Sequence, residues 1–99
     1  MDKIKFSVLN DVYGQLLTEK QKEIVNLYFS CDLSLAEIAE MKKISRSACL
    51  DSIEQAKQHL TKYESVLKLV ETKNRIENAL AKENSLEELK KEIKEILGD

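Results

Sequence analysis

Basic and hydroxyl side chains gather around residues 42–47, the stretch of this sequence best suited to binding chemistry. Arg46 carries a planar cation that can bind a phosphate group or the edge of a guanine base. Ser47 can donate a hydrogen bond to either group or accept one, and Lys42 and Lys43 can contact phosphates. The candidate binding residues are Lys42, Lys43, Ser45, Arg46, Ser47, Leu50 and Lys57. These residue types indicate recognition of nucleic acid.

Residues 34–60 contain the two helices that would position these side chains. Ser34 is followed three residues later by Glu37, which is the spacing of a reciprocal capping box, so a helix is expected to begin after Ser34. Ile38 and Ala39 lie on one side of this helix. Ala39 is small enough for a second helix to cross closely.

A second helix is expected after Ser45, which can cap it. Ile44, just before the cap, is apolar enough to lie under the turn. The buried face is predicted by apolar residues at a spacing of 4, 3 and 4, namely Cys49, Ile53, Ala56 and Leu60. Two short helices joined by a tight turn form a helix-turn-helix, whose second helix can lie in the major groove of DNA.

The outward face of this second helix mixes basic and acidic side chains. It would hold Arg46, Ser47, Leu50, Asp51, Glu54, Lys57 and Gln58. Asp51 and Glu54 stand in its middle, where each must find a cytosine amino group or face the phosphates. With about three to five phosphate contacts, binding would be weak and sensitive to salt. A dimer would double that number.

The composition favours an almost wholly helical chain. The 99 residues include no proline and only two glycines, Gly14 and Gly98, whereas 34% of the residues are charged. The formal net charge is -2, so the chain lacks the excess of basic residues that is typical of a non-specific nucleic-acid binder. No apolar run approaches the roughly 20 residues that span a bilayer, and the N-terminus has no signal-peptide core. We therefore expect a cytoplasmic protein without a membrane span.

The few reactive side chains do not form a metal or catalytic site. Cys31, Cys49 and the single histidine, His59, cannot supply the four ligands of a zinc site. We expect both cysteines to be reduced packing residues, with a regulatory thiol as the alternative for Cys31. His59 is either a partly exposed structural side chain or a phosphate contact. The sequence has no nucleophile–base pair and no phosphate-binding glycine loop, so neither an enzyme nor a cofactor is expected.

Two further helices are expected before the motif. The first spans residues 3–17, and Thr18 with Gln21 forms the capping box of the next. The apolar face of the first helix would comprise Ile4, Val8, Leu9, Val12, Leu16 and Leu17, with Phe6 and Tyr13 beside it. Tyr28 and Phe29 belong to the core or, as the alternative, form a platform on which bases stack.

Residues 1–63 are predicted to form the domain that contains the helix-turn-helix, and residues 64–99 a C-terminal helical extension. The motif's second helix can continue or bend near Tyr63. The extension begins with a stripe of Val66, Leu69, Ile76 and Leu80, interrupted by Lys73. Ser85 and Glu88 form a capping box before a last stripe of Leu86, Leu89, Ile93 and Leu97. These stripes either pack on the chain's own core or dimerise with a second copy.

Several short pieces between Leu9 and Ile53 match a known family in order and spacing. They are Leu9-Asn10-Asp11, Tyr13-Gly14, Leu17-Thr18-Glu19-Lys20-Gln21, Asp32-Leu33-Ser34-Leu35, Glu37-Ile38-Ala39-Glu40 and Ser45-Arg46. In these pieces the chain resembles the YlxM family, small bacterial proteins related in fold to region 4 of sigma factors. The resemblance implies an all-α fold, with a winged-helix-like or sigma factor region 4-like core and extended C-terminal helices. It also implies a regulatory DNA-binding protein of the signal recognition particle pathway, since the family is usually encoded beside the particle's GTPase.

The sequence departs from the family pattern near the motif's turn. Lys43 stands where Gly or Asn usually supplies a left-handed residue, and that conformation costs other residues about 1 kcal/mol. The turn is therefore expected to be either strained or shaped differently. Cys49 and Leu50 replace what are commonly Val and Tyr, and Glu54 replaces what is commonly Lys. The fold tolerates these changes more easily than a nucleic-acid interface does.

We therefore expect a helix-turn-helix regulatory protein that binds DNA and takes part in the signal recognition particle pathway. The alternative is an accessory protein that binds no DNA and contacts the particle's GTPase or its RNA. The nearly neutral charge and the acidic Asp51 and Glu54 favour this alternative. In either case a homodimer is expected.

Overall fold

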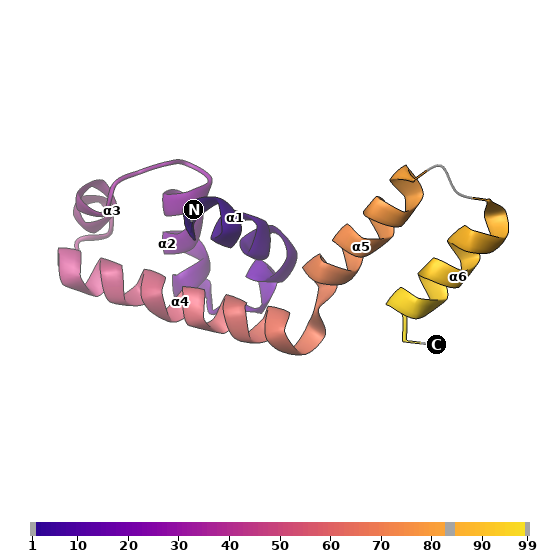
Figure 1. The fold of residues 1–99 in the computed structure, drawn as a ribbon. Coiled ribbons are helices and arrows are strands. Elements are labelled where there is room, and N and C mark those ends of the chain that lie inside the picture. The colour runs from indigo at the N-terminus through magenta and orange to yellow at the C-terminus, as the bar shows by residue number, and fades with distance from the viewer. Residues whose placement is uncertain (1, 83–84, 99) are drawn as a thin grey trace.

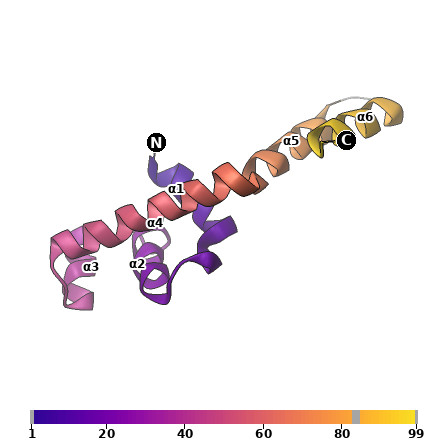
Figure 2. The same cartoon turned by 90° about the horizontal axis from the view of Figure 1, so that it is seen from below.

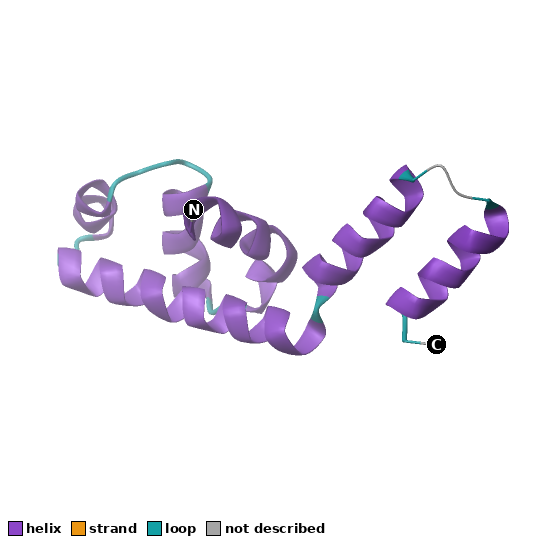
Figure 3. Cartoon of the chain, in the orientation of Figure 1, coloured by secondary structure: helices purple, strands orange, loops and turns teal. Residues whose placement is uncertain are grey.

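The computed structural model describes residues 2–82 and 85–98, and their regular structure is entirely helical (Figures 1 and 3). The elements are α1 (Asp2–Tyr13), the 3-10 turn η1 (Gly14–Leu16), α2 (Glu19–Phe29), α3 (Leu35–Lys42), α4 (Arg46–Leu67), α5 (Leu69–Ala81) and α6 (Leu86–Ile96). This architecture confirms the prediction of an all-α chain with a helix-turn-helix, formed by α3 and α4. The described residues contain no strand, and therefore no wing.

Side-chain caps fix where the helices begin. The Thr18 hydroxyl oxygen accepts a hydrogen bond from the Gln21 N–H at 3.2 Å, and the Gln21 side chain accepts one from the Thr18 N–H at 3.3 Å. Ser34 and Glu37 form the same reciprocal pair before α3, at 3.1 and 3.0 Å. These two of the three predicted capping boxes are confirmed, and each satisfies backbone donors that a helix start leaves unpaired.

Helix α4 organises the interior, because its buried side runs through two apolar clusters. The first cluster consists of Leu9, Tyr13, Leu17, Val25, Ala56 and Leu60. The second consists of Ile24, Ile38, Ala39, Cys49 and Ile53. The predicted buried face of α4 is confirmed at all four positions, each at most 1% exposed. Tyr28 and Phe29 pack against the two clusters, as the core interpretation predicts.

The first helix differs from its prediction in length and in its buried face. It ends at Tyr13, and the chain tightens into η1 at Gly14. Tyr13 is 1% exposed, whereas Ile4 is 71% exposed. The other members of the predicted face that lie outward are Val8, Val12 and Leu16, whereas Leu9 and Leu17 are buried as predicted. The helix is rotated because the Tyr13 hydroxyl is bonded inside the protein, which makes this aromatic ring the better core residue.

Helix α4 continues past Tyr63, without a bend there, and ends at Leu67. The chain direction changes at Lys68, whose backbone is left-handed at φ 53° and ψ 34°. The Glu64 carboxylate then accepts hydrogen bonds from the N–H groups of Val70 and Glu71 at 3.1 and 3.0 Å. Glu64 thereby caps α5, because Lys68, the residue directly before α5, makes no side-chain cap hydrogen bond.

The C-terminal helices form a hairpin in which α6 packs on α5, mainly away from the N-terminal core (Figure 1). Ser85 caps α6, since its hydroxyl accepts a hydrogen bond from the Glu88 N–H at 3.2 Å, which is one half of the predicted capping box. Lys82 and Glu92 pair across the hairpin at 2.7 Å. Figure 2 shows the hairpin and α3 at opposite ends of the molecule, which measures 58 × 23 × 19 Å.

Candidate nucleic-acid interface

The turn between α3 and α4 is closed by backbone hydrogen bonds around a left-handed residue. Lys43 has φ 54° and ψ 44°, so of the two expectations for this turn the left-handed one holds. Its N–H donates to the Glu40 carbonyl at 3.3 Å, and the Ile44 N–H donates to the Ala39 carbonyl at 3.1 Å. This pair of bonds is a Schellman motif, which satisfies carbonyls that a helix end leaves free. Ile44 packs beneath the turn, so the predicted contact is confirmed.

The two helices of the motif are held at close range by small and medium side chains. Ala39 and Ile38 of α3 are buried in one cluster with Cys49 and Ile53 of α4. Burial raises the pKa of the Cys49 thiol, so this cysteine is an unreactive packing residue, as predicted. The packing fixes the first turn of α4 at the surface.

Four of the seven candidate residues lie at this first turn or in the turn before it, and a fifth, Leu50, lies one helical turn further along. Ser45 caps α4, its hydroxyl accepting a hydrogen bond from the Ala48 N–H at 3.0 Å. Arg46, Ser47 and Lys43 are exposed, and no described residue bonds or pairs with their side chains. Leu50 is 43% exposed one turn further along the helix. The start of a helix also carries partial positive charge, which favours a bound anion.

The structure directs the other two candidates elsewhere. Lys42 turns back toward α2 and forms an ion pair with Glu23. Lys57 lies about three helical turns beyond Arg46. Its ammonium group lies 5.3 Å from the centre of the Phe6 ring and 3.5 Å from a carboxylate oxygen of Glu54. Neither lysine is available to a ligand at the first turn unless its present partner is displaced.

Acidic groups limit what this surface can bind. Asp51 and Glu54 are exposed on α4 beyond the first turn. Glu54 is offset by Lys57, whereas no described residue pairs with Asp51. A duplex that meets the first turn of α4 is therefore attracted by Arg46 and Lys43 and partly repelled by Asp51.

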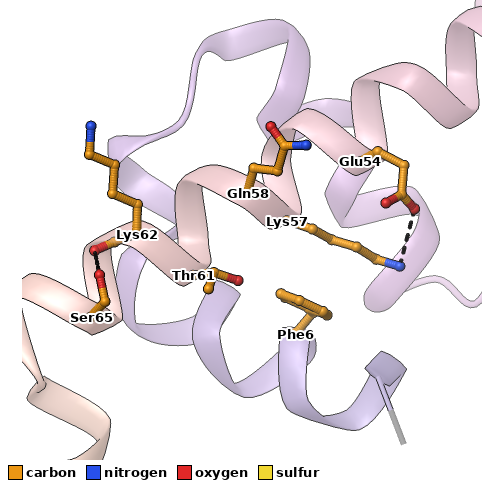
Figure 4. Close-up of a pocket in the computed structure, with 7 residues that line it drawn as sticks. All are labelled: Phe6, Glu54, Lys57, Gln58, Thr61, Lys62 and Ser65. Carbon is orange, nitrogen blue, oxygen red and sulfur yellow. Dashed lines mark hydrogen bonds and ion pairs between the residues drawn. The ribbon is translucent and has the colours of Figure 1, made fainter.

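A shallow groove along the middle of α4 was not predicted from the sequence. It has a volume of about 520 Å³ and is lined by Phe6, Glu54, Lys57, Gln58, Thr61, Lys62 and Ser65 (Figure 4). Phe6 comes from α1, and the other lining residues come from α4. No sequence pattern signals this groove, because its floor depends on how α1 packs against α4.

The remaining reactive residues occupy ordinary positions. Both cysteines are free, and Cys31 is exposed, so the expectation that it packs inside the protein is wrong. His59 is exposed, with its ring 6.4 Å from that of Tyr63. Over residues 2–82 and 85–98 no cluster of His, Cys, Asp and Glu could hold a metal ion. No helix in the same part of the chain is long and apolar enough to cross a membrane.

The chain is similar to a group of bacterial proteins over almost its whole length. The sequence model of a family described as "UPF0122: Putative helix-turn-helix protein, YlxM / p13 like" matches residues 1–97. A UPF0122 protein from Clostridium botulinum (strain Alaska E43 / Type E3) is 47% identical over 90% of this chain and 80% of its own length. Another from Clostridium perfringens (strain SM101 / Type A) is 41% identical over 99% and 91%. One from Desulforamulus reducens is 50% identical over 67% and 56%.

Proposed function

Because the chain belongs to the UPF0122 family of YlxM/p13-like helix-turn-helix proteins, we propose that it is a regulatory protein that binds duplex DNA. The first turn of α4 enters the major groove, and α3 holds it there. The protein is not an enzyme, and it acts in the cytoplasm in connection with the signal recognition particle pathway.

The observation that carries this proposal is the free cationic group at the start of α4. Arg46 is exposed and has no partner among the described residues, although many other basic side chains in the chain form ion pairs. A guanidinium group in this place can bind a phosphate or form two hydrogen bonds to a guanine. Ser47 supplies a second polar contact, and Leu50 supplies an apolar contact to a thymine methyl group.

Affinity is limited by the small number of free cations. Lys43 and Arg46 are free, and Lys42 and Lys57 become available only when they leave Glu23 and Glu54. With about two to four phosphates neutralised, the logarithm of the affinity falls with the logarithm of salt at a slope of about -2 to -3.5. Asp51 weakens binding further unless it accepts a hydrogen bond from a cytosine amino group.

Fluorescence anisotropy with labelled random duplex, at low and at physiological salt, tests the proposal. Arg46→Ala should weaken binding by about 5- to 30-fold, equivalent to about 1–2 kcal/mol. Arg75→Ala is the matched control, since Arg75 is an exposed arginine on α5. Equal binding by both variants and the parent would rule out the first turn of α4 as the binding surface.

The acidic groups on α4 favour a second candidate, an accessory protein that binds the signal recognition particle rather than DNA. The carboxylates of Asp51 and Glu54 can bind a basic protein surface, such as one on the particle's GTPase. The net charge of -2 does not repel such a surface. The particle's RNA and its GTPase, tested beside the duplex, separate the two candidates. Asp51→Asn should strengthen binding to duplex but weaken binding to the GTPase.

A further inference from the structure

The hairpin of α5 and α6 leaves one apolar face open to solvent. This face, called the hairpin face here, consists of Leu69, Ile76 and Leu80 of α5, Leu86 and Ile93 of α6, and Leu97, which directly follows α6. Within this face, Ile76 and Ile93 are partly buried. Its four leucines are between 51% and 66% exposed. Ala79 is the one fully buried residue of the hairpin among those described. Two helices alone therefore do not bury the apolar residues that they carry.

Both helices present the same pattern to this face. Each has a leucine, an isoleucine seven residues later and a leucine four residues after that. A lysine interrupts each stripe at the same place, Lys73 in α5 and Lys90 in α6. Such spacing puts the three apolar residues on one side of a helix. Because α5 and α6 lie side by side in opposite directions, the two stripes can form one continuous surface (Figure 1).

We propose that the hairpin face binds the hairpin face of a second copy of this chain, so that two hairpins close a four-helix bundle. Four helices are the number that encloses an apolar core from all sides in such bundles. The two stripes extend over most of the 13 residues of α5 and the 11 residues of α6.

The charges of the hairpin fit a second copy better than they fit nucleic acid. Helix α5 carries two basic and two acidic residues, and α6 carries three lysines and four glutamates. A surface that is nearly neutral and mixed in sign neither attracts a polyanion nor repels its own copy. The ammonium groups of Lys73 and Lys90 reach the rim of the bundle while their methylene chains cover apolar surface.

The dimer leaves the proposed nucleic-acid interface accessible. The hairpin and α3 lie at opposite ends of the molecule (Figure 2), so joining two hairpins keeps both α3–α4 motifs at the outer ends. Self-association does not depend on duplex binding, and it is measured without nucleic acid. A failure of one proposal is therefore distinguishable from a failure of the other.

Sedimentation equilibrium of the pure full-length chain tests the dimer. The protein concentration is varied from about 1 to about 100 µM, which covers the usual range of specific association. The parent should have a mass approaching twice 11.4 kDa. Leu80→Glu combined with Leu97→Glu should return the mass to that of one chain. Both residues are at least 60% exposed, so the variant should keep its helical circular dichroism. A parent mass of one chain throughout this range would overturn the proposal.

Two matched controls locate the interface. Ile4→Glu places the same charge on an exposed apolar residue of α1 and should leave the dimer intact. Lys90→Leu fills the gap in the hairpin face and should tighten the dimer. Lys91→Leu, one residue away and off the face, should not. Dissociation by Ile4→Glu, or equal tightening by both lysine variants, would overturn the assignment to this face.

Discussion

Replacing Glu64 by alanine should separate the C-terminal hairpin from the N-terminal core. The Glu64 carboxylate accepts hydrogen bonds from the Tyr13 hydroxyl at 2.5 Å and from the N–H groups of Val70 and Glu71. Losing a hydrogen bond to a charged acceptor costs about 1.5–3 kcal/mol, and Tyr13 is too deeply buried to bond water instead. Losing the cap of α5 adds about 1 kcal/mol.

The expected loss for Glu64→Ala is therefore about 3 kcal/mol of unfolding free energy. In a domain of this size that lowers Tm by roughly 10–25 °C, measured by thermal unfolding followed by circular dichroism. Glu64→Gln should lose less, because the amide oxygen can still accept hydrogen bonds. A double-mutant cycle with Tyr13→Phe should show that the two losses are not additive. A Tm for Glu64→Ala within about 3 °C of the parent would refute this role of Glu64.

The same carboxylate makes stability depend on pH. Burial alone would raise the pKa of Glu64, but hydrogen bonds from Tyr13, Val70 and Glu71 lower this pKa below its usual value of 4.5. A carboxyl whose pKa is lowered by folding stabilises the protein above the unfolded pKa, and this contribution is lost as pH falls through the folded pKa. The parent should thus lose more stability below about pH 4.5 than Glu64→Gln does. Parallel stability curves in acid would contradict this linkage.

Three further predictions concern the motif and the cysteines. Ser34→Ala should lower the unfolding free energy by about 1 kcal/mol in urea, because it removes the cap of α3, whereas an unchanged midpoint would show that the cap contributes nothing. Lys43→Gly should raise the unfolding free energy by about 1 kcal/mol, because glycine adopts a left-handed backbone without strain; a loss of stability would contradict this reasoning. A thiol reagent should label Cys31 alone in the folded protein and both cysteines in denaturant, because Cys49 is buried with a raised pKa. Rapid labelling of both cysteines without denaturant would show that the α3–α4 packing opens readily.

Local features of the fold were predictable because their causes lie within a few residues. The Ser34 and Thr18 capping boxes depend on side chains three residues apart. For Lys43 the position in the turn favours a left-handed backbone and the residue type opposes it, so the sequence left the shape of this turn open. The buried face of α4 follows from helical spacing alone, since nothing in the sequence competes with it.

Features set by long-range packing were not predictable in the same way. The face of α1 depends on the Tyr13–Glu64 hydrogen bond, which joins residues 51 positions apart. Hydrophobicity alone ranks Ile4 above Tyr13, so the sequence predicts only part of the buried face correctly, at Leu9 and Leu17. Lys42 and Lys57 were assigned to the candidate interface, but their partners Glu23 and Phe6 come from other helices. Of the predicted site residues, Lys43, Arg46 and Ser47 remain the best candidates, because their side chains are exposed and unpaired among the described residues.

Amide chemical shifts of the ¹⁵N-labelled protein, titrated with a short random duplex, show which surface of the protein binds DNA. We expect shift changes over residues 43–51, around the α3–α4 turn and the first turns of α4. The amides of α5 should stay unchanged, and Arg46→Ala should abolish most of the changes. Shift changes confined to α5 and α6, or none at all at low salt, would show that the first turn of α4 does not bind duplex DNA.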